Sequence, residues 1–423
     1  MEKHSYEEYL EILKEELVPA LGCTEPIAIA YAAAKAREVL GKMPESITVG
    51  CSGNIIKNVK AVIVPTTGDL KGIETSAILG GAIGGNPEKE LEVLVDVTDE
   101  DLRLTRKLLK EKICHVELLE GVSNLQIIVE LKAGEDTALA EIAFSHTNIV
   151  RLEKNGEVLF RKEKKAENAA TTDRSLLNLK DIYEFAQTVK IEEIQALIDR
   201  QLAYNMSIAR EGLTKKYGAN VGATIQKYYG DDVRNRARAL PAAGSDARMN
   251  GCVLPVMINS GSGNQGMTVS LPVAVFADYL YADKEKEYRA LVLPNLAAIY
   301  QKNELGKLSA YCGAVSAAAG AGAGIAYLHG ADFDTIAETM TNILANVSGI
   351  VCDGAKASCA AKIASSVDAA IMAYYMAAEH RGFRSGEGLV KEDVEATIRS
   401  FGRMGREGMR STDVEILKIM LEP

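Results

Sequence analysis

The stretch that constrains the fold most is GAVSAAAGAGAGIAYL at residues 313–328. It is apolar throughout, but alanine and glycine dominate it, and it is short and weakly hydrophobic for a membrane span. We therefore predict a buried helix whose small side chains allow close packing against its neighbours. Apolar residues recur at helical spacing over most of the chain after residue 179, so the surrounding region is predicted to be helical as well.

Three cysteines flank this predicted helix. Cys312 directly precedes it, and Cys352 and Cys359 follow it in the sequence CDGAKASC. Two interpretations of the thiols stay open. A free cysteine usually packs as a small apolar residue, and the spacing matches neither the ferredoxin runs nor a paired zinc site. Alternatively, three thiolates could hold one iron–sulfur cluster and leave one iron open as a Lewis acid.

The composition limits the classes of partner. The chain has 423 residues, enough for two or three domains, and a formal net charge of −10, which argues against nucleic acid and anionic membranes as partners. The N-terminus is polar and acidic, unlike a secretory signal, and the seven cysteines are an odd number. We therefore expect a cytoplasmic protein with reduced thiols.

The pattern along the chain predicts an α+β fold in three parts. Residues 1–45 should form N-terminal helices that pack on the large domain, residues 46–165 a small α+β domain, and residues 175–423 a large, mostly α-helical domain. The polar segment 162–178 is predicted to be a linker. Strands of the small domain are predicted at residues 46–51, 59–64, 91–97, 114–119, 125–131, 138–146 and 148–152.

Cys23 lies just before a predicted helix, because Thr24 is a good N-cap and Pro26 suits the first turn. Exposed N–H groups and the helix dipole would favour its thiolate there. A buried capping residue is the equal alternative.

The sequence GSGNQG at residues 261–266 matches the GxGxxG pattern of dinucleotide sites. Pro272 inside the helix that should follow, and the early position of Asp278, argue against that interpretation. We instead predict a loop whose N–H groups and short polar side chains cradle a carboxylate or phosphate; the side chains are those of Ser260, Ser262, Asn264 and Gln265.

Two further polar residues have open interpretations. Arg248 could bind a substrate carboxylate or form an ion pair with Asp246. His146 ends a predicted strand, and a structural role is the better interpretation because little else points to it.

Five motifs together resemble the L-cysteine desulfidase family, which is related to the alpha chain of iron–sulfur-dependent L-serine dehydratases. They are LGCTEP (21–26), SGNIIKN (52–58), SDARM (245–249), SGSGNQG (260–266) and RSTD (410–413). The resemblance covers nearly the whole chain. It implies an oxygen-sensitive lyase that converts a small amino acid, L-cysteine, to pyruvate, ammonia and hydrogen sulfide. It also implies a [4Fe-4S] cluster and no pyridoxal phosphate, and we expect a homodimer.

The resemblance also implies roles for single residues. Cys312 resembles the cysteine that precedes the Ala/Gly-rich helix of the dehydratases, Cys352 the cysteine of their Cys-Asp-Pro-Val-Gly-Gly motif, and Cys359 a third ligand, although the gap between the last two is shorter here. The cysteine that ends some dehydratases has no counterpart at the end of this sequence, which implies an open iron.

Cys23 is then the expected base, and the loop from Ser260 to Gly266, helped by Arg248, is expected to hold the carboxylate. The remaining cysteines, Cys51, Cys114 and Cys252, should be dispensable for the cluster.

Three alternatives remain at this point. L-serine dehydration by the same mechanism is the nearest one. A pyridoxal-phosphate eliminase would use Lys57 as its Schiff-base lysine. A non-catalytic metal- or thiol-sensing protein would bind a cluster without turning over any amino acid.

Overall fold

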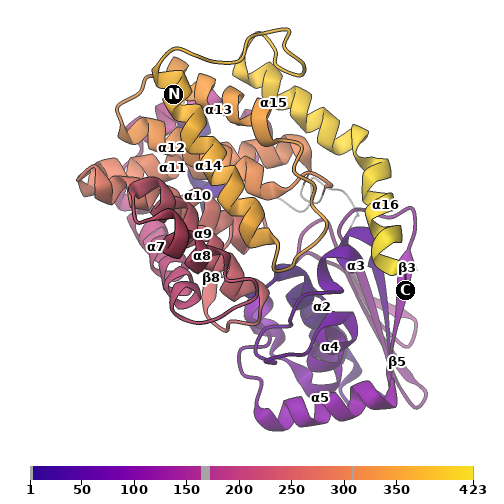
Figure 1. The fold of residues 1–423 in the computed structure, drawn as a ribbon. Helices are drawn as coiled ribbons and strands as arrows, with labels where there is room; N and C mark the ends of the chain where they lie inside the picture. The colour runs from indigo at the N-terminus through magenta and orange to yellow at the C-terminus, as the bar shows by residue number, and fades with distance from the viewer. Residues whose placement is uncertain (1–2, 163–171, 307–308, 423) are drawn as a thin grey trace.

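A computed structural model of the chain describes residues 3–162, 172–306 and 309–422. Figure 1 shows a helical part and a smaller part built on a sheet, with the C-terminal helix running from the first to the second. The α+β fold class predicted from the sequence is confirmed. Of the predicted linker at 162–178, residues 163–171 lie outside the described ranges, and the predicted domain limits stay predictions.

The helical part surrounds one large apolar core, to which α1 also contributes through Tyr9, Ile12 and Leu13. Its helices are α1 (Lys3–Glu16), η4 (Arg174–Leu176), α6 (Leu179–Thr188), α7 (Ile191–Thr214), α8 (Val221–Tyr229), α9 (Val233–Met249), α10 (Gly263–Tyr279), α11 (Lys284–Leu305), α12 (Gly313–Leu328), α13 (Phe333–Val347), α14 (Cys359–Ala378), α15 (Val394–Arg403), η5 (Met404–Gly408) and α16 (Arg410–Leu421).

Helix α12 lies in the middle of this part, in contact with α10, α11, α13 and α14. The predicted buried helix is confirmed, because nearly all of its residues are buried. Glycine permits the close approach. A methyl group added at Gly320 would lie 2.5 Å from the carbonyl oxygen of Pro294, and one at Gly324 would lie 2.7 Å from that of Ala290. Any larger residue at these positions would push α11 away.

The smaller part contains a six-stranded sheet in the order β3-β2-β4-β5-β6-β7, in which only β2 and β3 run parallel. Helix α2 packs against β4 and β5, and the apolar residues of both belong to a second core. The elements are α2 (Thr24–Leu40), β2 (Ser46–Ser52), α3 (Gly53–Val59), α4 (Gly72–Ile78), η1 (Leu79–Gly84), η2 (Pro87–Glu92), α5 (Asp99–Glu111), β3 (Cys114–Leu119), β4 (Gln126–Ala133), β5 (Asp136–Ala143), β6 (Ile149–Lys154) and β7 (Glu157–Arg161).

Several contacts hold the parts together, since residues of α7, α9 and α10 also belong to the second core. Strand β1 (Pro19–Leu21), between α1 and α2, pairs antiparallel with β8 (Pro255–Met257), between α9 and α10. Helix α16 reaches back and packs on α3 (Figure 1). The N-terminal segment is therefore shared, since α1 lies in the helical core and α2 in the sheet core.

Several predicted elements differ from the structure. The strand predicted at 59–64 is wrong, because Val59 ends α3 and the apolar residues after it form a turn with one isolated bridge, Ile63 to Lys71. The strand predicted at 91–97 is wrong too: this run begins in the 3₁₀ helix η2 and continues as a turn, with Leu91, Val93 and Leu94 buried. Short apolar runs do not separate strands from buried turns.

The glycine-rich stretch 241–275 is mostly helical. Helix α9 continues through Pro241 to Met249, and α10 starts at Gly263 and continues through Pro272. Both helices are largely buried, and tertiary packing overrides the low helix propensity of proline and glycine. Strand β8 before α10 pairs antiparallel with β1, so GSGNQG does not follow a parallel strand as in a dinucleotide-binding unit.

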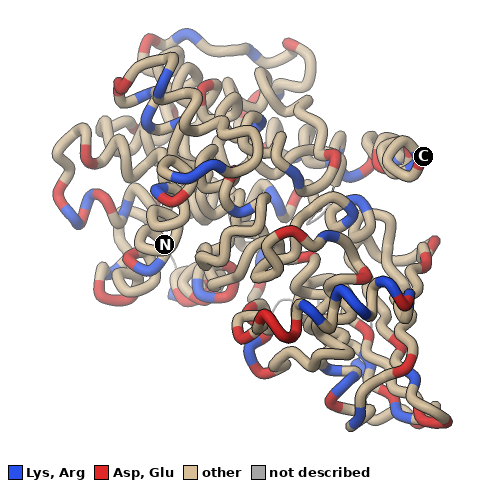
Figure 2. The backbone as a smooth tube through the Cα atoms, turned by 60° about the horizontal axis from the view of Figure 1, so that its bottom comes forward, with Lys and Arg blue, Asp and Glu red and all other residues tan. Residues whose placement is uncertain are grey.

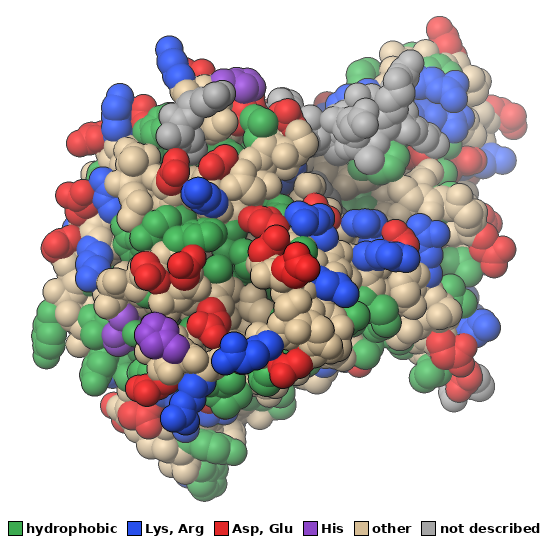
Figure 3. Space-filling view, turned by 90° about the horizontal axis from the view of Figure 1, so that it is seen from above, with side chains coloured by type: hydrophobic (Ala, Val, Ile, Leu, Met, Phe, Trp, Pro, Cys, Tyr) green, Lys and Arg blue, Asp and Glu red, His purple; other side chains and the backbone are tan. Residues whose placement is uncertain are grey.

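No helix within the described residues is both long and apolar enough to cross a membrane. Lysine and arginine alternate with aspartate and glutamate along most of the chain (Figure 2). The face in Figure 3 likewise carries charges of both signs among its apolar side chains.

Candidate functional site

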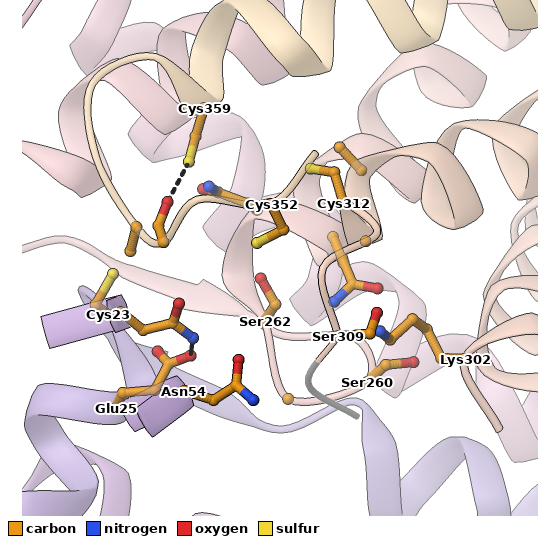
Figure 4. Close-up of a pocket in the computed structure, with 18 of the residues that line it drawn as sticks. Cys23, Glu25, Asn54, Ser260, Ser262, Lys302, Ser309, Cys312, Cys352 and Cys359 are labelled. Carbon is orange, nitrogen blue, oxygen red and sulfur yellow. Dashed lines mark hydrogen bonds between the residues drawn. The ribbon is translucent and has the colours of Figure 1, made fainter. Parts of the chain in front are cut away.

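A cavity lies where the helical part meets α2 and α3. All nine residues predicted to form a site line it: Cys23, Arg248, Ser260, Ser262, Asn264, Gln265, Cys312, Cys352 and Cys359. Figure 4 shows the four cysteine side chains around one opening. The other cysteines, Cys51, Cys114 and Cys252, are not among its lining residues.

Backbone pairing brings Cys312 and Cys352 together. The N–H of Cys312 donates to the carbonyl of Ile350 at 3.0 Å, and the N–H of Cys352 donates to that of Ala310 at 2.6 Å. These bonds flank an isolated antiparallel bridge between Tyr311 and Val351. The two thiols are therefore held by main chain rather than by long, mobile side chains.

The loop between Cys352 and Cys359 is fixed by charge. The carboxylate of Asp353 forms ion pairs with Lys356, at 2.7 Å, and with Lys362 of α14. Lys362 also donates to the carbonyl of Val351 at 2.7 Å. Gly354, with φ of 94°, touches the carbonyl of Lys57 in α3 and leaves no room for a side chain. Cys359 then begins α14 and faces back to the carbonyl of Gly354.

The three thiols suit an iron–sulfur cluster by their chemistry. A hydrogen bond from Cys312 lowers the pKa of Cys352 to about 6, and the same bond raises the pKa of Cys312. Nowhere in the described ranges are three His, Cys, Asp or Glu side chains close enough to hold one metal ion. A cubane cluster does not need three ligands on one metal ion, because each thiolate binds a different iron.

Cys23 is the N-cap of α2; the predicted N-cap, Thr24, is instead the first residue of the helix. Its side chain is buried and its thiol donates to the sulfur of Met249 at 3.8 Å. The expected lowering of its pKa is wrong: burial raises the pKa of Cys23 to about 12, although the charge of Arg248 opposes this. Desolvation outweighs the favourable helix terminus.

The predicted loop at Ser260 is a tight turn that leads into α10. Ser260 has φ of 51° and Gly261 φ of 77°, and Ser262 caps the helix, so Asn264 and Gln265 lie in its first turn. A buried chain of hydrogen bonds fixes the turn, from Ser260 to Asn259 at 2.9 Å and from Asn259 to Asn295 at 2.9 Å.

Arg248 is buried in the last turn of α9, and its Nε donates to the carbonyl of Gly22 at 2.7 Å. Among the described residues it forms no ion pair with Asp246. That carboxylate accepts instead from the N–H of Gly222 at 3.0 Å. The charge of Arg248 lowers the pKa of Cys23 and of Cys359, against the larger effect of burial, so Arg248 lies on their side of the cavity.

Several lining residues carry no functional signal in the sequence. Glu25, Asn54 and Asn58 lie within two of the motifs that carry the family resemblance, and His146, for which a structural role is predicted, also lines the cavity. Lys302 gave no signal, since it is a single lysine within a long helix. Ser309 and Tyr311 also line the cavity, beside Cys312.

Lys57 lines the cavity in an ion pair. Its side chain is buried, and Nζ lies 2.7 Å from a carboxylate oxygen of Asp413 in α16. The motifs SGNIIKN and RSTD, 356 residues apart at this pair, thus meet in space. An amine held by a carboxylate is a poor candidate for the Schiff-base lysine of a pyridoxal-phosphate enzyme.

Comparison with known proteins gives a consistent picture. The family model described as serine dehydratase alpha chain matches residues 88–418, a range that includes the three cysteines but not Cys23. A UPF0597 protein of Lachnoclostridium phytofermentans is 58% identical, over 98% of this chain and 100% of its own length. UPF0597 proteins of Desulfitobacterium hafniense and Treponema denticola are 52% and 48% identical, over 98% and 100% of this chain and 97% and 99% of their own lengths.

Proposed function

Because the chain belongs to the serine dehydratase alpha-chain family, we propose that it is an iron–sulfur-dependent lyase that eliminates the β-substituent of a small amino acid. The finer proposal is L-cysteine desulfidase, with pyruvate, ammonia and hydrogen sulfide as products. One observation carries the proposal: Cys312, Cys352 and Cys359 line the same cavity as Cys23 and the polar turn at Ser260.

In this proposal Cys312, Cys352 and Cys359 hold a [4Fe-4S] cluster. When bound, the cluster supplies a Lewis-acidic iron that polarises the bond to the β-substituent. Thiolate is a natural ligand of iron, which favours a substrate with a β-thiol. No pyridoxal phosphate is required.

The residues of the chain supply the remaining chemistry. Cys23 is the proposed base, which takes the α-proton while the bond from the β-carbon to sulfur breaks. It must act as a thiolate, which burial disfavours and the charge of Arg248 favours. Arg248 also remains a candidate for the substrate carboxylate. The turn from Ser260 to Gln265 orients the substrate. Aminoacrylate leaves the site, and water converts it to pyruvate and ammonia.

L-serine dehydration by the same route is the second candidate, because the matching family model is that of a serine dehydratase. Serine differs from cysteine by oxygen in place of sulfur. The hydroxyl is the poorer leaving group, so the two activities depend differently on the polarising iron.

An anaerobic assay tests both. The protein is reconstituted with iron and sulfide, its absorbance spectrum is recorded, and kcat/KM is measured for pyruvate and sulfide from L-cysteine and for pyruvate from L-serine. A broad brown absorbance with sulfide release supports the desulfidase. Pyruvate from L-serine alone identifies a dehydratase, and a cluster without turnover of either substrate contradicts an enzymatic role.

A further inference from the structure

Two buried charges in the cavity wall have no ionic partner among the residues that the structure describes. Glu25 is 9% exposed, and its carboxylate accepts hydrogen bonds from Asn58, at 2.8 Å, and Thr24, at 3.2 Å. Lys302 is 4% exposed and pairs with no described carboxylate; the charged groups that act on it are the thiols of Cys352 and Cys312 and the ammonium of Lys57. Lys57 is the informative contrast, since this second buried lysine of the cavity is matched by Asp413.

An unpaired buried charge is unfavourable, because neither water nor an opposite charge replaces its lost hydration. Buried charges of this kind in a cavity are typical of sites in which the ligand supplies the missing partner.

Amide oxygens beside these charges are unpaired as well. Within the described ranges, no hydrogen bond reaches the side-chain oxygens of Asn54, Asn58, Asn264 or Gln265, and all four residues line the cavity. The orientation of Asn58 is settled by its own NH₂ group, which donates to Glu25. Its oxygen is therefore the atom of this amide that remains free to accept a hydrogen bond.

The two charges stand at opposite sides of the cavity. Figure 4 shows Glu25 with Cys23 and Asn54 on one side, Lys302 with Ser309 and Ser260 on the other, and Cys352 between the two sides. One side presents acceptors and a negative charge, which suit an ammonium group. The other presents the positive charge of Lys302, which suits a carboxylate; the hydroxyls of Ser260 and Ser309 already donate to Asn259 and to the carbonyl of Tyr311.

We propose that Glu25, with Asn58, binds the α-ammonium group of the substrate and that Lys302 binds its α-carboxylate. The cavity would then select amino acids in which both groups are free, and it would direct the β-substituent toward the cysteines. This inference rests on the proposed function for the class of substrate. It assigns the carboxylate to Lys302 rather than to Arg248, whose Nε is already bound to Gly22 and which lies near Cys23.

Binding of unreactive ligands tests the inference without turnover. L-alanine carries both groups and no leaving group, L-alaninamide lacks the carboxylate, and propionate lacks the ammonium. Calorimetric titration of the purified protein with each ligand gives three affinities. Lys302→Met should weaken binding of L-alanine about tenfold or more and leave that of L-alaninamide nearly unchanged, because only the first ligand loses a charge-assisted hydrogen bond.

The other variants complete the test. Glu25→Gln should weaken the binding of L-alanine to a similar extent and leave the binding of propionate nearly unchanged. Lys302→Arg should restore part of the preference for L-alanine over L-alaninamide. Lys57→Met is the matched control, since it removes a buried lysine of the same cavity that already has a partner; both preferences should persist in it. Circular dichroism and iron content of every variant report on folding and on the cluster.

Several outcomes would overturn the inference. These are failure of the unaltered protein to bind L-alanine, equal affinities for the three ligands, or loss of the carboxylate preference in Arg248→Met instead of Lys302→Met. Loss of iron in Lys302→Met with unchanged preferences would show that Lys302 serves the nearby thiolates. Failure of the proposed function is separate, because it shows only as absence of turnover in the anaerobic assay.

Discussion

The cysteines of the cavity have different proposed roles, so their substitution should affect iron content and activity differently. Cys312→Ala and Cys352→Ala should each lose iron, brown absorbance and activity together, because each removes a proposed ligand. Cys23→Ala should keep the iron and lose turnover about 100-fold or more, since it removes the proposed base. Iron content, absorbance and sulfide release are measured anaerobically for each variant.

Cys114→Ala serves as the control for these variants, because Cys114 lies in β3 and does not line the cavity. It should retain both iron and activity. Loss of iron in Cys23→Ala would make Cys23 a cluster ligand, and full activity in that variant would remove it as the base.

Asp246 predicts a dependence of stability on pH. Burial raises the pKa of its carboxyl to about 6, whereas an aspartate in the unfolded chain titrates near 4. The folded protein therefore keeps the proton to higher pH than the unfolded chain. The stability contributed by the neutral acid is full below about pH 4, declines as the pH rises to about 6, and is absent above it.

Asp246→Asn should abolish this pH dependence. Between pH 4 and pH 7.5 its free energy of unfolding should rise, relative to that of the unaltered protein, by up to about 3 kcal/mol, the equivalent of about two pKa units. Urea unfolding of both proteins at the two pH values measures the difference. If the gap between their unfolding midpoints were the same at both pH values, the proton would not be held in the folded state.

At the scale of single elements, α12 depends on glycine at defined positions. Gly320→Ala should lower the free energy of unfolding by about 2 kcal/mol, because the added methyl group meets the carbonyl of Pro294 in α11 and backbone cannot yield easily. Thermal or urea unfolding measures the change.

Gly322→Ala is the matched control within the same helix. Its methyl group would lie 3.3 Å from the side chain of Thr339, which can give way, and 3.4 Å from Ala370, which is an ordinary van der Waals distance. Both substitutions gain the same helix propensity, so the difference between them reports packing. Equal stabilities of the two variants would refute close packing of α12 on α11.

Helix α16 is anchored by an ion pair as well as by the packing of Leu417 on the second core. None of its residues is fully buried, yet Asp413 pairs with the buried Lys57. Asp413→Ala should lower the free energy of unfolding by about 2 kcal/mol or more, because it leaves the buried ammonium of Lys57 unpaired. The double variant Lys57→Met with Asp413→Ala should recover part of the loss. Urea unfolding of the four proteins gives the coupling energy, and a coupling near zero would contradict the role of this pair.

Across the whole molecule, the sequence predicted a set of residues that share one cavity, although it missed two of the helices that carry them. The predicted site residues, from Cys23 to Cys359, line one cavity. They could be predicted because thiols and polar turns indicate possible sites whichever element carries them. Helices α9 and α10 were missed because proline and glycine usually end helices, and here burial outweighs that preference.

Glu25 and Lys302 mark the limit of prediction from sequence. Neither residue type is unusual, and their interest lies in being buried without an ionic partner among the described residues. The burial and pairing of these two residues depend on how α2 and α11 pack at the junction of the two parts. No local pattern in a single sequence predicts that packing.

The bridge between Tyr311 and Val351 also bears on the order of assembly. Cys312 and Cys352 are separated along the chain by α12 and α13, so their thiols come together only after this helical hairpin has formed and closed its loop. During synthesis the chain must therefore reach residue 352 and fold before the two thiols can act as a pair. We therefore expect the cluster to be inserted late, into a chain that has already folded. The cluster would not be needed to direct folding.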